Sequence, residues 1–274
     1  FMWKSITVIN NKETVKKQEL IMERNVVIAG WGQITQPKQL SSPPKNALGL
    51  MEAASLQAFE ITRKKSFLSS LDGVMVVRIV SGHYPAAAHQ LANSLGISPK
   101  FTYVSGIGGN SPQTLVNMAA GMISRGDMDS VLIAGAETYV QRQDNAKKPE
   151  SALFQGVPKD YSGDDLTGAA PLEIRHGIEH PMQGFPLFET ALWAESELNI
   201  NAYLTKVGEM WAAFSEVGAM HPMAWTKTPR TAQEIITQGQ SNRPVAFPYT
   251  KFMNSFVTVD QGAAVLLAAE EKAC

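Results

Sequence analysis

The strongest constraint on the fold is an alternation of apolar strands with helical segments in the first half of the chain. Helical patterns are expected at residues 46–65, 85–95 and 111–124, and apolar strands at residues 25–30, 73–80, 101–105 and 130–136. Strand–helix units of this kind form a mostly parallel sheet with right-handed crossovers. The last of these strands has no polar alternation, which predicts helices on both faces of the sheet.

The pattern changes after residue 138. Residues 139–255 combine prolines and aromatic side chains with helical segments at 188–197 and 202–217, which predicts an inserted, largely α-helical region. An apolar strand then returns at 257–270. The predicted fold class is therefore α/β: residues 22–138 and 256–274 form a five-stranded, mostly parallel sheet with helices on both faces, and residues 139–255 form an inserted domain.

Residues 1–21 differ from the rest of the chain. They are polar and rich in lysine, and Met22 stands just before the first predicted strand. We expect them to be a leader or a disordered segment outside the fold. Glu13 and Glu19 argue against a mitochondrial signal, because such signals are poor in acidic residues.

Composition limits the possible partners. The 24 basic and 25 acidic side chains leave a net charge of −1, which argues against binding to nucleic acid or to a membrane surface through bulk charge. The longest apolar runs are far shorter than the roughly 20 residues that span a bilayer. Cys274 is the only cysteine, so no disulfide forms within the chain and a reducing, cytoplasmic location is expected.

A glycine-rich turn joins the strand at 101–105 to the helix at 111–124. Ser111 is expected to cap this helix, with Pro112 in its first turn. Backbone N–H groups at a helix start attract negative charge, so the turn can hold a carboxylate, a phosphate or a thioester oxygen. The candidate donors of this oxyanion and substrate site are Gly108, Gly109, Asn110 and Ser111. The alternative is that the glycines only make a tight turn.

The residues from 104 to 137 resemble a segment of the thiolase superfamily, in which a strand leads to a nucleophilic cysteine at a helix start and a later strand ends in Gly-Ala-Glu. The stretch VTVDQGAAVLLAAEEKA, at 257–273, resembles the last strand of the thiolase N-terminal half. The stretches GGNSPQ, PLFE and HPMAW…NRPVAFPYTKFMNS resemble thiolase-like proteins labelled acetyl-CoA acetyltransferase. The resemblance covers roughly residues 25–273.

The resemblance implies a βαβαβαββ half followed, in the family, by a second half of the same topology. That second half would belong to the same gene or to a separate chain, and both possibilities stay open. The family's nucleophilic cysteine falls on Gly108, counting back from Gln113. Glycine cannot be acylated, so the ping-pong acyl transfer of true thiolases is not supported. Decarboxylation or retro-aldol cleavage through a thioester enolate needs no protein nucleophile and remains possible.

Coenzyme A or an acyl-CoA is the ligand that the resemblance implies, and no covalently bound cofactor is expected. The family holds CoA with its loop domain, which corresponds to the insertion here. Basic and aromatic side chains of the insertion are the candidate contacts: Arg175, Trp225, Lys227, Arg230, Arg243 and Lys251. For each of them alone, a solvated surface position is the alternative.

Two further functions are open. The chain can be a non-catalytic scaffold subunit, because some thiolase-like proteins that lack the nucleophile work with small OB-fold, zinc-ribbon partners. Thiolases also pair through the third strand, here 101–105, which implies a homodimer. A dinucleotide-binding domain is a minor alternative, since Gly-Ile-Gly-Gly-Asn-Ser lies between a strand and a helix and Glu137 ends the next strand.

The histidines do not predict a metal site. His176 and His180 are four residues apart, but the order HGIEH differs from H-E-x-x-H, and Gly177 and Pro181 disfavour a helix there. His221 mimics a Gly-His-Pro motif of the thiolase second half, but its neighbours match the insertion instead.

Overall fold

The structure is a computed structural model that describes residues 24–38, 43–64, 66–139, 169–256 and 258–274. The leader predicted at 1–21 and much of the first part of the predicted insertion lie outside the described residues. We use the name "helical insertion" for the elements between residues 171 and 253.

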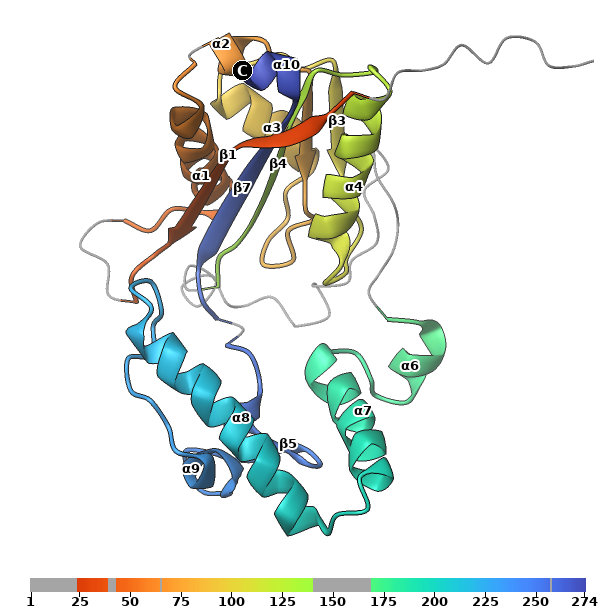
Figure 1. Ribbon diagram of the computed structural model, residues 1–274, viewed down its shortest axis with the longest axis vertical. Coiled ribbons are helices and arrows are strands. Elements are labelled where there is room, and N and C mark those ends of the chain that lie inside the picture. Colours follow the sequence, from red (N-terminus) through yellow and green to blue (C-terminus); the bar gives the residue numbers. More distant parts are fainter. Residues whose placement is uncertain (1–23, 39–42, 65, 140–168, 257) are drawn as a thin grey trace, which may run out of the picture.

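One five-stranded sheet forms the core of the α/β part, in the upper half of Figure 1, with its strands in the order β1-β7-β4-β2-β3. Strands β2, β3 and β4 are parallel to one another, and β7 runs antiparallel to both β1 and β4. The strands are β1 (Val26–Thr35), β2 (Gly73–Val76), β3 (Phe101–Val104), β4 (Ser130–Glu137) and β7 (Gln261–Ala269). This mixed but mostly parallel sheet confirms the predicted fold class.

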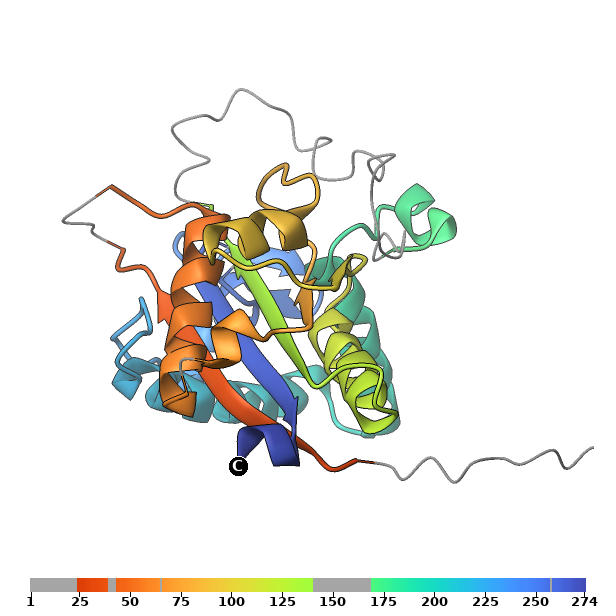
Figure 2. The same cartoon turned by 90° about the horizontal axis from the view of Figure 1, so that it is seen from above.

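Helices cover both faces of the sheet, as predicted (Figure 2). On one face α1 (Ala47–Thr62) and α3 (Ala87–Ser94) bury apolar side chains against β2, β4 and β7. On the other face α4 (Ser111–Ser124) buries Leu115, Ala119 and Ile123 against Met75, Ile133 and Leu267. Two short helices, α2 (Ser66–Ser69) and α10 (Glu270–Ala273), lie at the amino end of the parallel strands.

Strand β1 is longer than the predicted strand at 25–30. It pairs with β7 along its whole length, with one irregularity between Ile28 and Gly30. Gly30 and Gly32 of this strand let α1 pack closely against it, because a Cβ at either position would lie 2.0 Å from a backbone oxygen of α1. The close approach of helix to strand therefore depends on glycine, a constraint that apolar periodicity does not reveal.

Strand β2 is shorter than the predicted strand at 73–80. Beyond it, the backbone N–H groups of Val80 and Ser81 donate to the carboxylate of Glu137, at 2.7 and 2.6 Å. A side chain thus replaces a neighbouring strand as the acceptor, and the chain leaves the sheet. Glu137 is part of the Gly-Ala-Glu sequence that the resemblance singled out.

The start of α1 follows the sequence prediction. Asn46 is the N-cap residue, and its side-chain oxygen accepts a hydrogen bond from the N–H of Gly49 at 2.9 Å. The helix ends at Thr62, three residues before the predicted end, because Arg63 adopts a left-handed conformation with φ of 55°.

The helical insertion lies beyond the carboxyl ends of the parallel strands (Figure 1). Its own small core consists of Val207, Ile235 and Met253, with partly buried neighbours. Its elements are α6 (Pro171–Arg175), α7 (Pro181–Glu195), α8 (Ile200–Met220), α9 (Ala232–Ile236), β5 (Pro244–Ala246), β6 (Tyr249–Thr250) and the 3₁₀ helix η2 (Lys251–Met253). The helices predicted at 188–197 and 202–217 correspond to α7 and α8, and both begin earlier than predicted.

Large apolar side chains are exposed on several elements of the described chain, above all on α7, α8 and β1. Helix α7 exposes Phe185, Phe188 and Leu192, and its only buried residue is Pro186. Further exposed apolar side chains are Met210, Phe214 and Val217 on α8, and Ile28 and Trp31 on β1. Among the described residues, no helix is long and apolar enough to cross a membrane.

Candidate functional site

The turn before α4 differs from the sequence prediction. Asn110 is the N-cap residue, and its side chain makes no capping hydrogen bond. Ser111 is instead the first residue of the helix, followed by Pro112 in the first turn as predicted. The Ser111 hydroxyl donates to the carbonyl of Gly106 at 3.0 Å, and its N–H donates to the carbonyl of Gly108 at 3.1 Å. The prediction that Ser111 caps the helix is wrong, because both of its donors turn back onto the preceding residues.

Of the four predicted donors, three have no acceptor for their backbone N–H within the described part of the chain: Gly108, Gly109 and Asn110. Gly109 and Asn110 are exposed, and Gly108 is half-buried. They lie at the positive end of α4, where negative charge is favoured. The turn therefore presents three donors rather than four, and its role in binding a substrate stays a prediction.

Gly108 occupies the position that the resemblance assigns to the nucleophile. A Cβ at this position would lie 2.7 Å from Oδ1 of Asn110 and 3.3 Å from Oγ of Ser111. The Asn110 oxygen is the end of an exposed side chain that can rotate, whereas Ser111 is buried and held by Gly106. The backbone thus has room for a small side chain here once Asn110 turns away.

A pocket of about 330 Å³ lies where the helical insertion meets the sheet. The second half of α8, the turn after it and the chain that enters β7 form its walls. The rings of Trp225 and Phe256 meet edge-on, with centroids 6.5 Å apart. The apolar lining residues are Ala219, Met223, Ala224, Trp225, Phe256 and Val259, and the polar ones include Ser215, Thr226 and Gln261. We call this the junction pocket.

The junction pocket lies at the carboxyl edge of the sheet. Its lining residue Gln261 pairs with Glu137, the last residue of β4. In open α/β sheets, ligands bind outside the carboxyl ends of the strands. Small-molecule sites are also mostly apolar, with a few polar groups. Position and lining therefore both suit a ligand with an apolar part.

The six residues predicted to hold CoA do not form one cluster. Arg230, Arg243 and Lys251 lie close together at the end of the insertion that carries α9. The guanidinium of Arg230 is 3.7 Å from the centre of the Phe252 ring, next to Lys251. The N–H of Lys251 donates to the carbonyl of Arg243 at 2.9 Å.

The other three candidates lie elsewhere. Trp225 lines the junction pocket, and Lys227 follows two residues later, with its ammonium group donating to the carbonyls of His221 and Pro222. Arg175 ends α6, which Figure 1 shows apart from α8 and α9. Of the six candidates, Trp225 alone lines the pocket, whereas Arg230 donates its backbone N–H to the lining residue Ser215 at 3.0 Å. CoA contacts at all six positions stay a prediction.

Glu189, the last residue of the PLFE sequence, holds two tyrosines. Its carboxylate accepts hydrogen bonds from the hydroxyls of Tyr203 on α8 and Tyr249 on β6, at 2.5 and 2.7 Å. Burial, and then the hydrogen bond to Glu189, raise the pKa of Tyr203 to about 12 and also raise the pKa of Tyr249. The cluster ties three elements of the insertion together.

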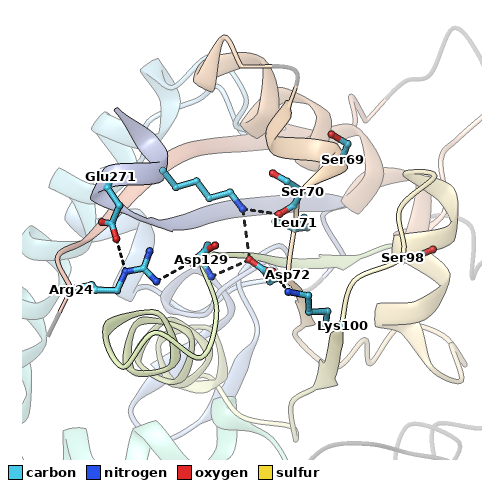
Figure 3. A pocket seen from close by; sticks show the side chains of 10 residues that line it. Arg24, Ser69, Ser70, Leu71, Asp72, Ser98, Lys100, Asp129 and Glu271 are labelled. Atoms are coloured by element: carbon cyan, nitrogen blue, oxygen red, sulfur yellow. Dashed lines mark hydrogen bonds and ion pairs between the residues drawn. The ribbon is translucent and has the colours of Figure 1, made fainter. Parts of the chain in front are cut away.

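A second pocket, of about 560 Å³, lies at the opposite, amino edge of the sheet (Figure 3). The Asp72 carboxylate accepts the N–H groups of Asp129 and Ser130, at 3.0 and 3.2 Å, and bonds to Nζ of Lys100 at 3.1 Å. Burial alone would raise the pKa of Asp72, but these hydrogen bonds and the nearby Lys272 hold it below its usual value.

Every basic side chain at this second pocket faces an acid. Arg24 bridges Asp129 and Glu271, while Lys100 and Lys272 both face Asp72. The Lys272 ammonium also donates to Ser130 Oγ at 2.7 Å. Because the charges are already paired, the cluster fastens α10 to the amino ends of β2 and β4 rather than offering charge to a ligand.

His176 and His180 do not share a helix. The first is the C-cap residue of α6 and the second is the N-cap residue of α7, with Gly177 at φ of 75° between them. The expectation that Gly177 and Pro181 disfavour a helix across HGIEH is confirmed. No group of three or more potential metal ligands was found within the described ranges.

Sequence reasoning found Trp225 but not the residues around it. The indole N–H of Trp225 donates to the carbonyl of Gln36, and its ring meets Phe256. Asp260 in turn bonds to Gln36. Phe256 is the first residue after the predicted insertion and was not a candidate. Gln36 and Asp260 are buried polar residues beside strand ends, and they are far apart in the sequence. The only available signal in the sequence was the acid Asp260, which stands two residues before Gly262 at the start of an apolar strand.

Solved structures resemble the chain over most of its length. A monomeric SCP2-thiolase like protein type 1 from Mycobacterium smegmatis matches with a TM-score of 0.70 and 27% identity, over 90% of this chain and 46% of that one. An Ltp2-ChsH2(DUF35) aldolase matches with a TM-score of 0.63 and 18% identity, over 92% of this chain and 58% of that one. No protein-family model matches the sequence, and no curated protein does.

These matches confirm that the chain is thiolase-like, whereas the resemblance to proteins labelled acetyl-CoA acetyltransferase stays a prediction. It spans about half the length of the matched chains, at 46% and 58%.

Proposed function

We propose that this thiolase-like chain binds an acyl-CoA thioester, with the apolar part of the ligand in the junction pocket. The observation that carries the proposal is the position of that pocket. Its lining is mostly apolar and includes two aromatic rings, and it lies at the carboxyl edge of the sheet where α/β folds bind ligands. Lys227 stands two residues from Trp225 and supplies a positive charge for a phosphate of CoA.

The chemistry that fits is a reaction of the thioester without a protein nucleophile. Gly108 has no side chain to acylate, so acyl transfer through this position does not occur. The N–H groups of Gly108, Gly109 and Asn110 are suited to stabilise the oxyanion of a thioester enolate. Retro-aldol cleavage or decarboxylation generates such an enolate, and one of the similar structures is described as an aldolase.

Ligand binding is the direct test. We expect isothermal titration with octanoyl-CoA to give measurable affinity, and the K227A variant to weaken it several-fold by removing a phosphate contact. The matched control is K206A, which removes an exposed lysine from the first half of α8. At a ligand concentration of about 100 times Kd, binding should stabilise the protein by about 2.7 kcal/mol in thermal unfolding. Absence of binding by the wild-type chain, or equal effects of both variants, would contradict the proposal.

A second candidate function is that of a subunit in a protein complex. The exposed apolar side chains of α7, α8 and β1 favour it, since large exposed apolar patches mark protein–protein contacts. A similar structure contains a DUF35 partner, and β3 lies at the sheet edge through which a homodimer is predicted. Sedimentation of the purified chain, alone and with a coexpressed OB-fold, zinc-ribbon protein, tests this function. If the chain sediments as a monomer both alone and with the coexpressed protein, this function is contradicted.

A further inference from the structure

The helical insertion is fastened to the sheet by a polar cluster beside the junction pocket. Asp260, which is fully buried, precedes β7, and its carboxylate accepts the N–H of Tyr139 at 2.6 Å. The chain leaves the sheet after β4 at Tyr139 and returns to it at Asp260. The bond between these two residues therefore joins the two ends of the segment that carries the helical insertion. Gln36, after β1, donates its backbone N–H to the carbonyl of Asp260 at 3.0 Å and its side-chain amide to the carboxylate at 3.3 Å.

The orientation of the Gln36 side chain is fixed by a second pair of bonds. Its oxygen accepts the N–H of Lys45 at 2.7 Å, and its amide nitrogen donates to the carbonyl of Lys45 at 3.0 Å. With the side chain and the N–H engaged in this way, the backbone carbonyl of Gln36 faces the insertion. It accepts the indole N–H of Trp225 at 2.7 Å.

We infer that Trp225 is a positioning residue that seats the helical insertion on the carboxyl edge of the sheet and thereby builds the junction pocket. Its indole group spans the two parts: the N–H is held by Gln36 of the sheet, while the ring packs edge-on against Phe256 and lines the pocket. This differs from the role that the resemblance implies, in which Trp225 is a direct contact of CoA. The part of the inference that concerns ligand affinity rests on the proposed function.

The chain offers a closely matched control in Trp193. Its indole N–H donates to a backbone carbonyl, that of Leu198, at 2.9 Å, and its ring packs edge-on against Phe247 at 6.0 Å. Both tryptophans are half-buried. The difference is that Trp193 bonds within the insertion, whereas Trp225 bonds across to the sheet. W225F and W193F therefore remove the same kind of hydrogen bond and keep an aromatic ring.

The experiment measures hydrogen exchange and ligand affinity in both variants. In W225F, exchange should become about three- to tenfold faster in peptides that contain Gln36 and Ala224, as expected for the loss of one hydrogen bond. In W193F, those peptides should exchange at the wild-type rate. Octanoyl-CoA affinity should fall about three- to tenfold in W225F and stay unchanged in W193F.

The outcomes separate this inference from the proposed function. If W225F exchanges like W193F in these peptides, Trp225 does not hold the insertion and the inference is wrong. The same holds if W225F loses affinity without faster exchange, because Trp225 would then act only by touching the ligand. If no variant binds octanoyl-CoA but W225F alone shows faster exchange, the positioning role stands and the proposed function fails.

Discussion

The hydroxyl of Ser111 donates to the backbone carbonyl of Gly106 across the turn that begins α4. This bond holds the start of the helix without a side-chain cap, and the half-buried Gly108 lies in the same turn. The position that carries a nucleophile in the resembled family is thereby kept next to the free end of α4. Its chemical environment can be tested by restoring a thiol there.

We predict that a G108C variant in a C274S background has a thiol pKa below the usual value of about 8.5, because the helix N-terminus favours the thiolate. The pH dependence of alkylation by iodoacetamide measures this pKa. The wild-type chain, whose exposed Cys274 is the only thiol, is the control. If the introduced thiol reacts no faster at neutral pH than Cys274 does, the turn presents no positive field.

Replacing Asp260 should destabilise the fold even though the new side chain has the same shape. In D260N an amide group would face the side-chain amide of Gln36, which Lys45 holds in one orientation. Two donors would then meet in a buried site, at a cost of about 1–3 kcal/mol. Urea unfolding measures the loss. The exposed D127N variant, whose acid pairs with Arg125 at the surface, should change stability by less than about 0.5 kcal/mol.

Asp72 should make the protein sensitive to acid. Its pKa is lowered in the folded state, so its stabilising effect is present at pH values above the unfolded value of 3.8 and disappears as the pH falls through the lower folded value. The D72N variant should therefore be less stable than the wild type at neutral pH, and the difference should shrink below pH 3.8. Urea unfolding at a series of pH values checks this, and a difference independent of pH would contradict it.

Glu189 should control the alkaline titration of two tyrosines. Because the folded pKa of Tyr203 is raised from 10.0 to about 12, its contribution to stability is complete below pH 10 and is lost as the pH rises towards about 12. In E189Q the pKa of Tyr203 should fall, although burial still keeps it above the usual value. Ultraviolet absorbance of phenolate measures the titration. E195Q, at the exposed end of the same helix, should leave the tyrosines unchanged.

Sequence by itself was enough for the sheet, its layers and the thiolase-like class. Buried parallel strands such as Ser130–Glu137 are continuous apolar runs, and helices such as α1 carry their cap signal in Asn46. These features depend on residues close together in the chain. The exact lengths of β1 and β2 did not follow from the sequence, because they depend on contacts between residues far apart in the chain. Gly30 of β1 lies against the backbone of Ala58, and the N–H of Val80, beyond β2, donates to Glu137.

The site needed the tertiary structure. Sequence named Trp225 and the glycine turn as candidates, but Gln36, Trp225 and Asp260 meet only because β1 and β7 are neighbours in the sheet. Distances between residues far apart in the chain decide that the carbonyl of Gln36 accepts the indole N–H of Trp225. The bend of the turn before α4 decides which of its backbone donors already have an acceptor. Periodicity encodes which side chains are buried, whereas a pocket also depends on how the separate segments are placed relative to one another.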